Sequence, residues 1–168
     1  MKATNDYFRD KVMIITGASS GIGLACARLF ASRGALLVLA SRNIGKLNQI
    51  AEEVTDDPSR ILCVKTDVSV EEDCRNMIDA AVRKFGRIDV LVNNAGISMR
   101  APFADVDLKV IKRLMDVNFW GTVYCTKYAL PWLVASKGSV VGVISTAGYA
   151  GLPGRTGYAT SKFAIRGF

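Results

Sequence analysis

Tyr158 and Lys162 are the residues of this chain whose types and spacing best suit proton transfer. Residues four apart on a helix share one face. An ammonium group beside a phenol favours the phenolate, so the tyrosine could act as an acid or a base. The 168 residues include no histidine, which excludes a Ser-His-Asp triad, a Cys-His pair and an imidazole metal site. Proton chemistry is therefore left to tyrosine, lysine, cysteine or carboxylates.

The spacing alone is weak evidence, because Tyr7 and Lys11 repeat it in the charged N-terminal stretch. A Tyr-x-x-x-Lys pattern is most often only one face of a helix. Tyr158 differs in its context, since Ser145 ends an apolar run thirteen residues earlier and a glycine-rich loop lies between them. Ligands of α/β sheets bind outside the carboxyl ends of the strands. We therefore expect Ser145 and the glycine-rich turn at residues 16–23 to face one crevice, and Tyr7 has no such neighbour.

A glycine-rich segment, TGASSGIG at residues 16–23, lies between a predicted strand and a predicted helix. Gly17, Gly21 and Gly23 would let the backbone turn sharply and approach a ligand closely. A phosphate could then accept hydrogen bonds from free N–H groups at the helix N-terminus. The spacing differs from GxGxxG, and a plain glycine-rich turn is the alternative. Its position after the first strand favours a dinucleotide phosphate site.

The second strand ends in Ala40-Ser41-Arg42-Asn43, without a carboxylate. An acidic residue at this position binds the ribose 2′-hydroxyl of NAD, whereas arginine accommodates the 2′-phosphate of NADP. Arg42 could make charge-assisted hydrogen bonds to such a phosphate, with Ser41 as a neutral donor. The strand end thus favours NADP(H) over NAD(H). The alternative is that Arg42 is a surface residue on the first turn of the next helix.

These residues need an alternating set of strands and helices to position them. Apolar runs predict strands over residues 12–15, 36–40, 61–64, 90–92 and 139–144. Amphipathic patterns predict helices over residues 22–33, 44–54, 69–85, 107–136 and 158–168. Ser69 and Glu72 form a capping box for the third helix, Gly86 ends it, and Pro131 predicts a kink or break in the fourth.

The continuous apolar strands suit a parallel sheet covered on both faces. Strand–helix alternation predicts a doubly wound α/β domain over residues 11–168, after an N-terminal tail of residues 1–10.

The net charge of +7 is unevenly distributed. Residues 117–168 carry five basic residues and no acidic one, but the basic residues are scattered. A nucleic-acid surface requires clustered charge, so a solvated surface with a small anionic ligand is the favoured interpretation. The four cysteines form no CxxC pair, and the chain has neither a signal-peptide pattern nor an 18-residue apolar run. We expect a soluble cytoplasmic protein with reduced thiols, without a metal or a membrane span.

Several motifs follow one another along the chain in the order found in a known protein family. They are TGASSGIG at 16–23, Asn93-Asn94-Ala95-Gly96 after the fourth strand, Asn118, Ser145 and Tyr158-x-x-x-Lys162. Together they resemble the short-chain dehydrogenase/reductases, from about residue 10 to the last residue. The resemblance implies a Rossmann-type sheet of strand order 3-2-1-4-5 and a carbonyl–alcohol oxidoreductase using NADP(H).

The resemblance also implies roles for individual residues. The cofactor-binding residues would be Gly17, Ser19, Ser20, Gly21, Ile22 and Gly23 at the pyrophosphate, Ser41 and Arg42 at the 2′-phosphate, Asp67 and Val68 at the adenine, and Asn94, Ala95, Gly96, Tyr158 and Lys162 along the crevice. Tyr158 would exchange the proton of the substrate oxygen, and Lys162 would favour its phenolate and hold the nicotinamide ribose. Ser145 would donate a hydrogen bond to the substrate oxygen. Asn118 would position a water in a proton relay to Lys162, although from sequence it could equally be a polar residue in a helix kink.

Members of the resembled family form domains of about 250 residues. The resemblance therefore implies that the last strands, the rest of the catalytic helix and a substrate loop are missing from this chain. We expect exposed apolar surface on the fifth strand and the long helix, and a homodimer or homotetramer. Met99, Phe103, Tyr149 and Leu152 would suit an apolar carbonyl substrate. The alternative function is a non-catalytic nucleotide-binding or interaction module on the same fold.

Overall fold

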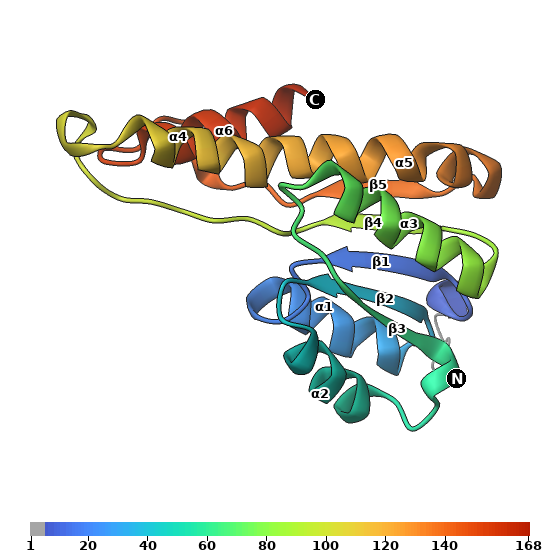
Figure 1. The fold of residues 1–168 in the computed structure, drawn as a ribbon. Coiled ribbons are helices and arrows are strands. Elements are labelled where there is room, and N and C mark those ends of the chain that lie inside the picture. Colours follow the sequence, from blue (N-terminus) through green and yellow to red (C-terminus); the bar gives the residue numbers. More distant parts are fainter. Residues whose placement is uncertain (1–5) are drawn as a thin grey trace, which may run out of the picture.

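The computed structural model describes residues 6–168 and contains one sheet of five parallel strands (Figure 1). The strands are β1 (Val12–Thr16), β2 (Leu36–Ser41), β3 (Ile61–Lys65), β4 (Val90–Asn93) and β5 (Ser139–Gly142). Their order is β3-β2-β1-β4-β5, which confirms the predicted Rossmann-type arrangement. Because every neighbouring pair is parallel, the carboxyl ends of all five strands lie at one edge of the sheet.

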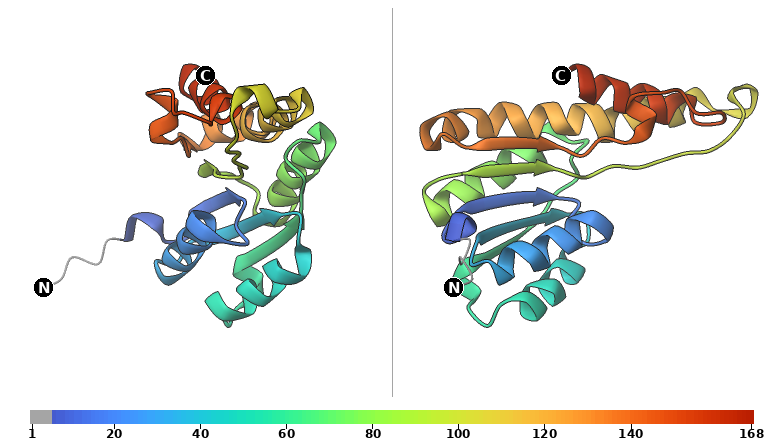
Figure 2. Two further views of the ribbon diagram at one scale, coloured as in Figure 1. Left: turned by 90° about the vertical axis from the view of Figure 1, so that its left-hand side faces the viewer. Right: turned by 180° about the vertical axis from the view of Figure 1, so that it is seen from behind.

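The helices are α1 (Gly21–Ser32), α2 (Ile44–Val54), α3 (Glu71–Phe85), α4 (Leu108–Leu114), α5 (Gly121–Ser136) and α6 (Thr156–Gly167). Helices α1 and α2 cover one face of the sheet, and α3 and α5 cover the other (Figure 2). Side chains alternate along each strand to supply both cores. Met13 of β1 packs in a cluster with Leu47 of α2, whereas the next residue, Ile14, packs in a second cluster with Met77 of α3. Helix α6 lies against the long helical region around α4.

Strand β5 departs from the prediction of a sheet covered on both faces. Val140 and Val141 point to opposite faces, yet they are 44% and 45% exposed. Strand β5 is bordered only by β4 among the described strands, so the expectation of exposed apolar surface at the fifth strand is confirmed here. Leu130, Trp132 and Val134 of α5 are also exposed, in agreement with the same expectation for the long helix.

The predicted capping box is wrong, and of the two alternatives predicted at Pro131, the break is not observed. Helix α3 begins at Glu71 after Val70, and the Ser69 hydroxyl donates to Asp67 Oδ1 at 2.6 Å, so the capping box does not form. The predicted break at Pro131 is absent, because α5 continues to Ser136. Pro131 has no N–H to donate to the carbonyl four residues earlier. Because Pro131 is exposed, water can hydrogen-bond to that carbonyl instead. The irregularity of the long helical region is instead a π-helical turn at Met115–Trp120, between α4 and α5.

The predicted N-terminal tail lies partly outside the described residues. From its described part, Asp6–Phe8 form a short 3₁₀ helix, and the Phe8 ring lies 5.1 Å from the Phe30 ring of α1. The Tyr7 side chain is 64% exposed, and Lys11 pairs with Asp89 at 3.4 Å, at the amino ends of the strands. This second Tyr-x-x-x-Lys pattern therefore lies at the edge of the sheet opposite to Tyr158.

Asp89 joins the beginnings of β1 and β4. Its carboxylate accepts the Val12 N–H at 2.9 Å and the Arg87 guanidinium at 2.6 Å, and the side chain is only 3% exposed. Burial alone would raise the pKa of Asp89, but these hydrogen bonds and the charges of Arg87 and Lys11 hold it below its usual range. The carboxylate form is therefore the stabilising one.

Replacing Asp89 by Asn is expected to lower the free energy of unfolding at neutral pH by about 1–3 kcal/mol, because the Val12 N–H and Arg87 lose a charged acceptor. A lowered pKa adds stability above the unfolded pKa of about 4, and this stability is lost as pH falls through the folded pKa. Urea unfolding between pH 7 and pH 3 should thus be less pH-dependent in D89N than in the wild type. Asp79→Asn, at an exposed position of α3, is the control. Equal stabilities of D89N and wild type at pH 7 would contradict the prediction.

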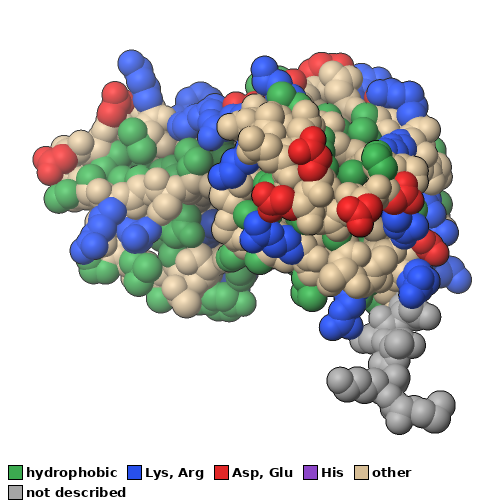
Figure 3. Space-filling model, turned by 90° about the horizontal axis from the view of Figure 1, so that it is seen from below, with side chains coloured by type: hydrophobic (Ala, Val, Ile, Leu, Met, Phe, Trp, Pro, Cys, Tyr) green, Lys and Arg blue, Asp and Glu red, His purple; other side chains and the backbone are tan. Residues whose placement is uncertain are grey.

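The surface carries charges of both signs. On the face seen in Figure 3, Lys and Arg side chains are dispersed among acidic, polar and apolar ones and form no continuous band. Within residues 6–168, no helix is long and apolar enough to cross a membrane. In the same residues, no group of three or more Cys, Asp or Glu side chains could hold a metal ion. All four cysteines are free thiols.

Candidate active site

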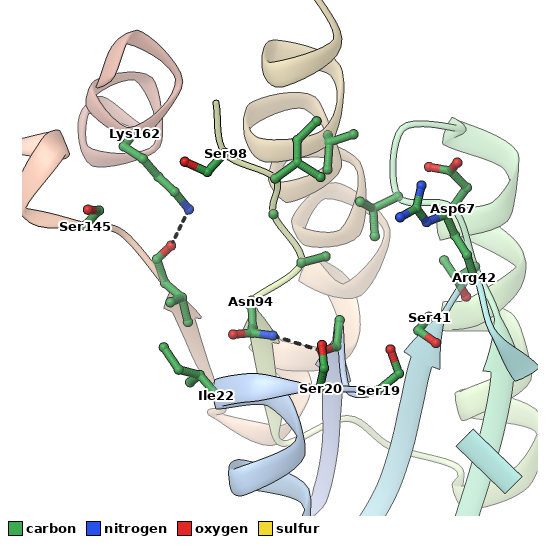
Figure 4. A pocket seen from close by; sticks show the side chains of 18 of the residues that line it. Ser19, Ser20, Ile22, Ser41, Arg42, Asp67, Asn94, Ser98, Ser145 and Lys162 are labelled. Carbon is green, nitrogen blue, oxygen red and sulfur yellow. Dashed lines mark hydrogen bonds between the residues drawn. The ribbon is translucent and has the colours of Figure 1, made fainter. Parts of the chain in front are cut away.

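A cleft of about 640 Å³ opens at the carboxyl ends of the strands (Figure 4). Most of the predicted site residues line it: Gly17, Ser19, Ser20, Ile22, Ser41, Arg42, Asp67, Val68, Asn94, Ala95, Gly96, Ser145, Tyr158 and Lys162. They come from the ends of all five strands and from the first turns of α6. Residues as far apart in the chain as Gly17 and Lys162 thus share one cavity.

The glycine-rich turn after β1 packs very closely on the loop after β4. Gly17 has φ +65°, and a Cβ there would lie 2.9 Å from the Ala95 Cα. A Cβ on Gly23 would meet the Gly17 carbonyl oxygen and lie 2.6 Å from Asn94 Nδ2. Both positions therefore require glycine, Gly17 at the cleft wall and Gly23 behind it. Gly21 has φ +54° and, like Gly23, shapes the turn without lining the cleft.

Asn94 and Thr16 hold this turn in place. Asn94 Nδ2 donates to the Thr16 carbonyl at 2.8 Å, and the Thr16 hydroxyl accepts the N–H groups of Asn94 and Ala95, both at 3.0 Å. The same hydroxyl donates to the Val92 carbonyl at 3.3 Å. The Asn94 side chain is therefore engaged with the protein backbone. It fixes the shape of the cleft floor between β1 and β4.

One end of the cleft carries Arg42 and Asp67 (Figure 4). The Asp67 carboxylate accepts the N–H and the hydroxyl of Ser69, at 3.0 and 2.6 Å, and pairs with Arg113 of α4 at 3.3 Å. Burial alone would raise the pKa of Asp67, but the Ser69 hydrogen bonds and the Arg113 charge lower it. Asp67 is therefore a fixed hydrogen-bond acceptor at this end of the cleft. Arg42 is the positively charged residue that lines the same end.

The other end carries Lys162, which is 5% exposed. Its Nζ donates to the Val143 carbonyl at the end of β5, at 2.8 Å, and lies 5.8 Å from the centre of the Tyr158 ring. Burial lowers the pKa of Lys162. This shift makes the ammonium a readier proton donor than an exposed lysine. The helical i, i+4 spacing thus places a buried ammonium beside the phenol ring, as the sequence predicts.

Ser145 lies at the same end, in the loop that follows β5 (Figure 4). Its side-chain oxygen accepts the Ala147 N–H at 3.2 Å, which orients the hydroxyl at the start of a short 3₁₀ helix, Thr146–Gly148. Because the Ala147 contact uses a lone pair of the oxygen, the hydroxyl proton remains available as a donor.

Asn118 lies in the π-helical turn and is fully buried outside the cleft lining. Its amide accepts the Ile97 N–H at 2.8 Å and donates to the Ile97 carbonyl at 2.9 Å and to the Ser161 hydroxyl at 2.8 Å. A Cβ on Gly96 would lie 3.2 Å from Asn118 Oδ1 and 3.5 Å from Lys162 Nζ. Gly96 therefore lets both polar groups come close to the loop after β4.

The cleft also contains residues that motif reasoning did not select. They are Asn43, Thr66, Ile97, Ser98, Val117, Val143 and Ile144. Asn43, Thr66, Val143 and Ile144 lie within two residues of a strand end, and that position is the signal that could have found them. The expected apolar residues Met99, Phe103, Tyr149 and Leu152 do not line this cleft. In the described residues, the apolar wall at the Ser145 end is formed by Ile97, Val143 and Ile144 instead.

Comparison with known proteins agrees with this arrangement. The model of the short chain dehydrogenase family matches residues 11–168. The chain is 44% identical over 160 residues to 11-beta-hydroxysteroid dehydrogenase A of Sesamum indicum, covering 94% of this chain and 46% of that protein. The chain thus spans about half the length of the curated relatives it matches.

Solved structures give the same result. A short chain dehydrogenase/reductase from Burkholderia phymatum, in complex with NAD, superposes with a TM-score of 0.90 at 30% identity, covering 95% of this chain and 58% of that one. An alcohol dehydrogenase from Thermococcus sibiricus, complexed with 5-hydroxy-NADP, superposes with a TM-score of 0.91 at 30% identity, covering 95% of this chain and 68% of that one. With the family model matching nearly the whole chain and the site residues meeting in one cleft, this chain belongs to the short-chain dehydrogenase family.

Proposed function

We propose that the protein is an NADP(H)-dependent oxidoreductase that interconverts a carbonyl compound and an alcohol. The observation that carries the proposal is that one cleft holds the glycine-rich turn at its floor, Arg42 at one end, and Ser145, Tyr158 and Lys162 at the other. The family binds nicotinamide dinucleotides, and structural neighbours carry NAD in one case and an NADP derivative in another.

The residues present fit a dinucleotide phosphate. Gly17 lines the cleft, where the lack of a Cβ lets the turn pack against Ala95, and Ser19 and Ser20 add polar groups beside it at the N-terminus of α1. Ser41 and Arg42 would hold a 2′-phosphate, and Asp67 would accept a hydrogen bond from the adenine amino group. Tyr158 and Lys162 would then flank the nicotinamide ribose at the far end.

In the proposed reduction, Tyr158 donates its phenolic proton to the carbonyl oxygen. Ser145 donates a hydrogen bond to the same oxygen and stabilises the charge that develops there. When bound, NADPH would supply the hydride that reduces the carbonyl to an alcohol and would itself become NADP⁺. Lys162 stabilises the phenolate that remains and returns a proton to it. Asn118 would position a water for this relay, which is supported by the approach of both Asn118 and Lys162 to Gly96.

We propose that the substrate is an apolar carbonyl compound. We also propose that the protein works in a reducing, cytoplasmic compartment. Ile97, Val143 and Ile144 at the Ser145 end support an apolar substrate, as does the hydroxysteroid dehydrogenase name of the sesame relative. The free thiols are in keeping with the compartment. We also propose a homodimer or homotetramer. It is supported by two exposed aromatic side chains, Trp120 in the π-helical turn before α5 and Phe163 in α6, which are 44% and 42% exposed.

Replacing Arg42 by Ala is expected to raise the Kd of NADPH by about 10–100-fold, because a charge-assisted hydrogen bond is worth about 1.5–3 kcal/mol. The Kd of NADH, which lacks the 2′-phosphate, should change less than about twofold. Fluorescence titration of both cofactors against wild type and R42A measures the two constants. Lys46→Ala, on the exposed side of α2, is the matched control. An equal loss of affinity for NADPH and NADH would refute the assignment of Arg42 to the 2′-phosphate.

The function itself is tested by titrating the protein with NADPH and then following NADPH absorbance with a panel of apolar ketones and aldehydes. We expect saturable binding and carbonyl-dependent consumption of NADPH. Binding without consumption across the panel would favour a non-catalytic nucleotide-binding module. Absence of binding would overturn both functions.

A further inference from the structure

Arg155 connects the loop after β4 with the first turn of α6. It directly precedes α6, and its Nη1 donates to the Ser98 hydroxyl at 2.7 Å. Its guanidinium carbon lies 5.7 Å from the centre of the Tyr158 ring, within the range of a cation–π contact. One half-buried side chain thus contacts both the loop after β4 and the ring of the proposed proton donor.

A backbone hydrogen bond reinforces this connection. The Ala101 N–H donates to the Gly154 carbonyl at 2.9 Å, next to Arg155. Gly154 has φ +70°, and a Cβ there would lie 3.5 Å from the Ala101 carbonyl oxygen. The loop after β4 and the segment before α6 are therefore joined at two adjacent points, one from the backbone and one from Arg155.

Ser98 makes the connection relevant to the substrate. It lines the cleft at the end that holds Ser145, Tyr158 and Lys162, whereas Arg155 stands behind it outside the lining. A hydrogen bond from a guanidinium fixes the orientation of the Ser98 hydroxyl and hence the position of that wall. The distance between this wall and the phenol decides how a carbonyl compound fits against Tyr158.

We propose that Arg155 is a positioning residue for the carbonyl substrate, which acts by holding Ser98 and the Tyr158 ring at a fixed separation. This inference rests on the proposed function and adds to it a residue outside the Ser145, Tyr158 and Lys162 group. Arg155 makes no contact with the glycine-rich turn or the Arg42 end, so its loss should affect binding of the carbonyl substrate more than binding of NADPH.

The test uses four variants of the protein: Arg155→Ala, Arg155→Lys, Ser98→Ala and the double variant R155A/S98A. Arg166→Ala is the matched control, because Arg166 lies on the same helix and contacts the Tyr149 ring at 4.2 Å, outside the cleft. The measurements are kcat and KM for the carbonyl substrate, the Kd of NADPH and the melting temperature.

We expect R155A and S98A each to raise KM for the carbonyl compound by about 5–50-fold, which corresponds to the loss of about 1–2 kcal/mol of binding. The double variant should be no worse than R155A, since both substitutions remove the same hydrogen bond. R155K should recover part of the KM, because lysine keeps one donor and the charge. The Kd of NADPH and the melting temperature should stay near those of the wild type and of R166A. Unchanged KM in R155A, or multiplicative effects in the double variant, would overturn the proposal.

Failure of the proposed function is distinguished by a readout that needs no turnover. If the wild type consumes no NADPH with any carbonyl compound, the proposed function fails, and with it the substrate role of Arg155. The bridge that Arg155 forms between the loop after β4 and the segment before α6 is then tested by hydrogen exchange at the Ala101 amide. Faster exchange in R155A than in wild type and R166A would support the bridge, and equal exchange in all three would overturn it as well.

Discussion

Replacing Tyr158 by Phe is expected to lower kcat for carbonyl reduction by about 10²–10⁴-fold, the usual contribution of a positioned general acid. The phenylalanine ring keeps the contacts of the tyrosine ring with Lys162 and Arg155, so only the proton donor is lost. The Kd of NADPH should change by less than about threefold, because the glycine-rich turn and Arg42 are untouched. Single-turnover absorbance at 340 nm with saturating substrate separates the chemical step from binding.

Tyr149→Phe is the matched control for this experiment. Tyr149 is 61% exposed in the loop before α6, does not line the cleft, and contacts Arg166 through its ring. Its replacement should leave kcat within about twofold of the wild type. If Tyr158→Phe retained full turnover, the proton would have to come from another group of the cleft, and the assignment of Tyr158 would be wrong.

Replacing Gly23 by Ala is expected to raise the Kd of NADPH more than tenfold and to lower the free energy of unfolding by about 1–3 kcal/mol. The added Cβ would meet the Gly17 carbonyl oxygen and lie 2.6 Å from Asn94 Nδ2, and both atoms belong to a turn held by backbone hydrogen bonds. The turn must therefore move away from α1, and its N–H groups move with it. Isothermal titration and urea unfolding measure the two effects.

Gly45→Ala provides the comparison within a helix. A Cβ at Gly45 would lie 3.6 Å from Asn43 Oδ1, an ordinary contact, and the residue is in the first turn of α2. Alanine has the higher helix propensity, so this variant should be as stable as the wild type or more stable. Normal NADPH affinity in Gly23→Ala would contradict the proposal that this closely packed turn binds the cofactor phosphates.

Sequence predicted the parts of the molecule that depend on local pattern and chain order. Continuous apolar runs indicated the five parallel strands, and strand ends indicated where Gly17, Ser145 and Tyr158 would meet. The resemblance supplied the strand order that the structure confirms. These inferences succeed because parallel strands end at a common edge, so residues after each strand converge without knowledge of side-chain packing.

Features that depend on tertiary contacts could not be predicted in this way. Ser69 matches a capping pattern, yet its hydroxyl is drawn to Asp67, which Arg113 also binds across 46 positions of the chain. The link between Ser98 and Arg155 spans 57 positions and has no motif. The π-helical turn around Asn118 likewise has no recognisable signal, because it results from packing of the long helical region on Ile97 and Ser161.

The proposed function requires that this cleft transfer a hydride from NADPH to a carbonyl compound. The most direct measurement supplies NADPH carrying deuterium at C4 of the nicotinamide, on each face in turn, with apolar ketones, and analyses the products by mass spectrometry. We predict that one labelled form yields an alcohol with a single deuterium on the former carbonyl carbon, and that Tyr158→Phe yields almost none. Saturable NADPH binding without deuterated alcohol from any ketone would contradict the account.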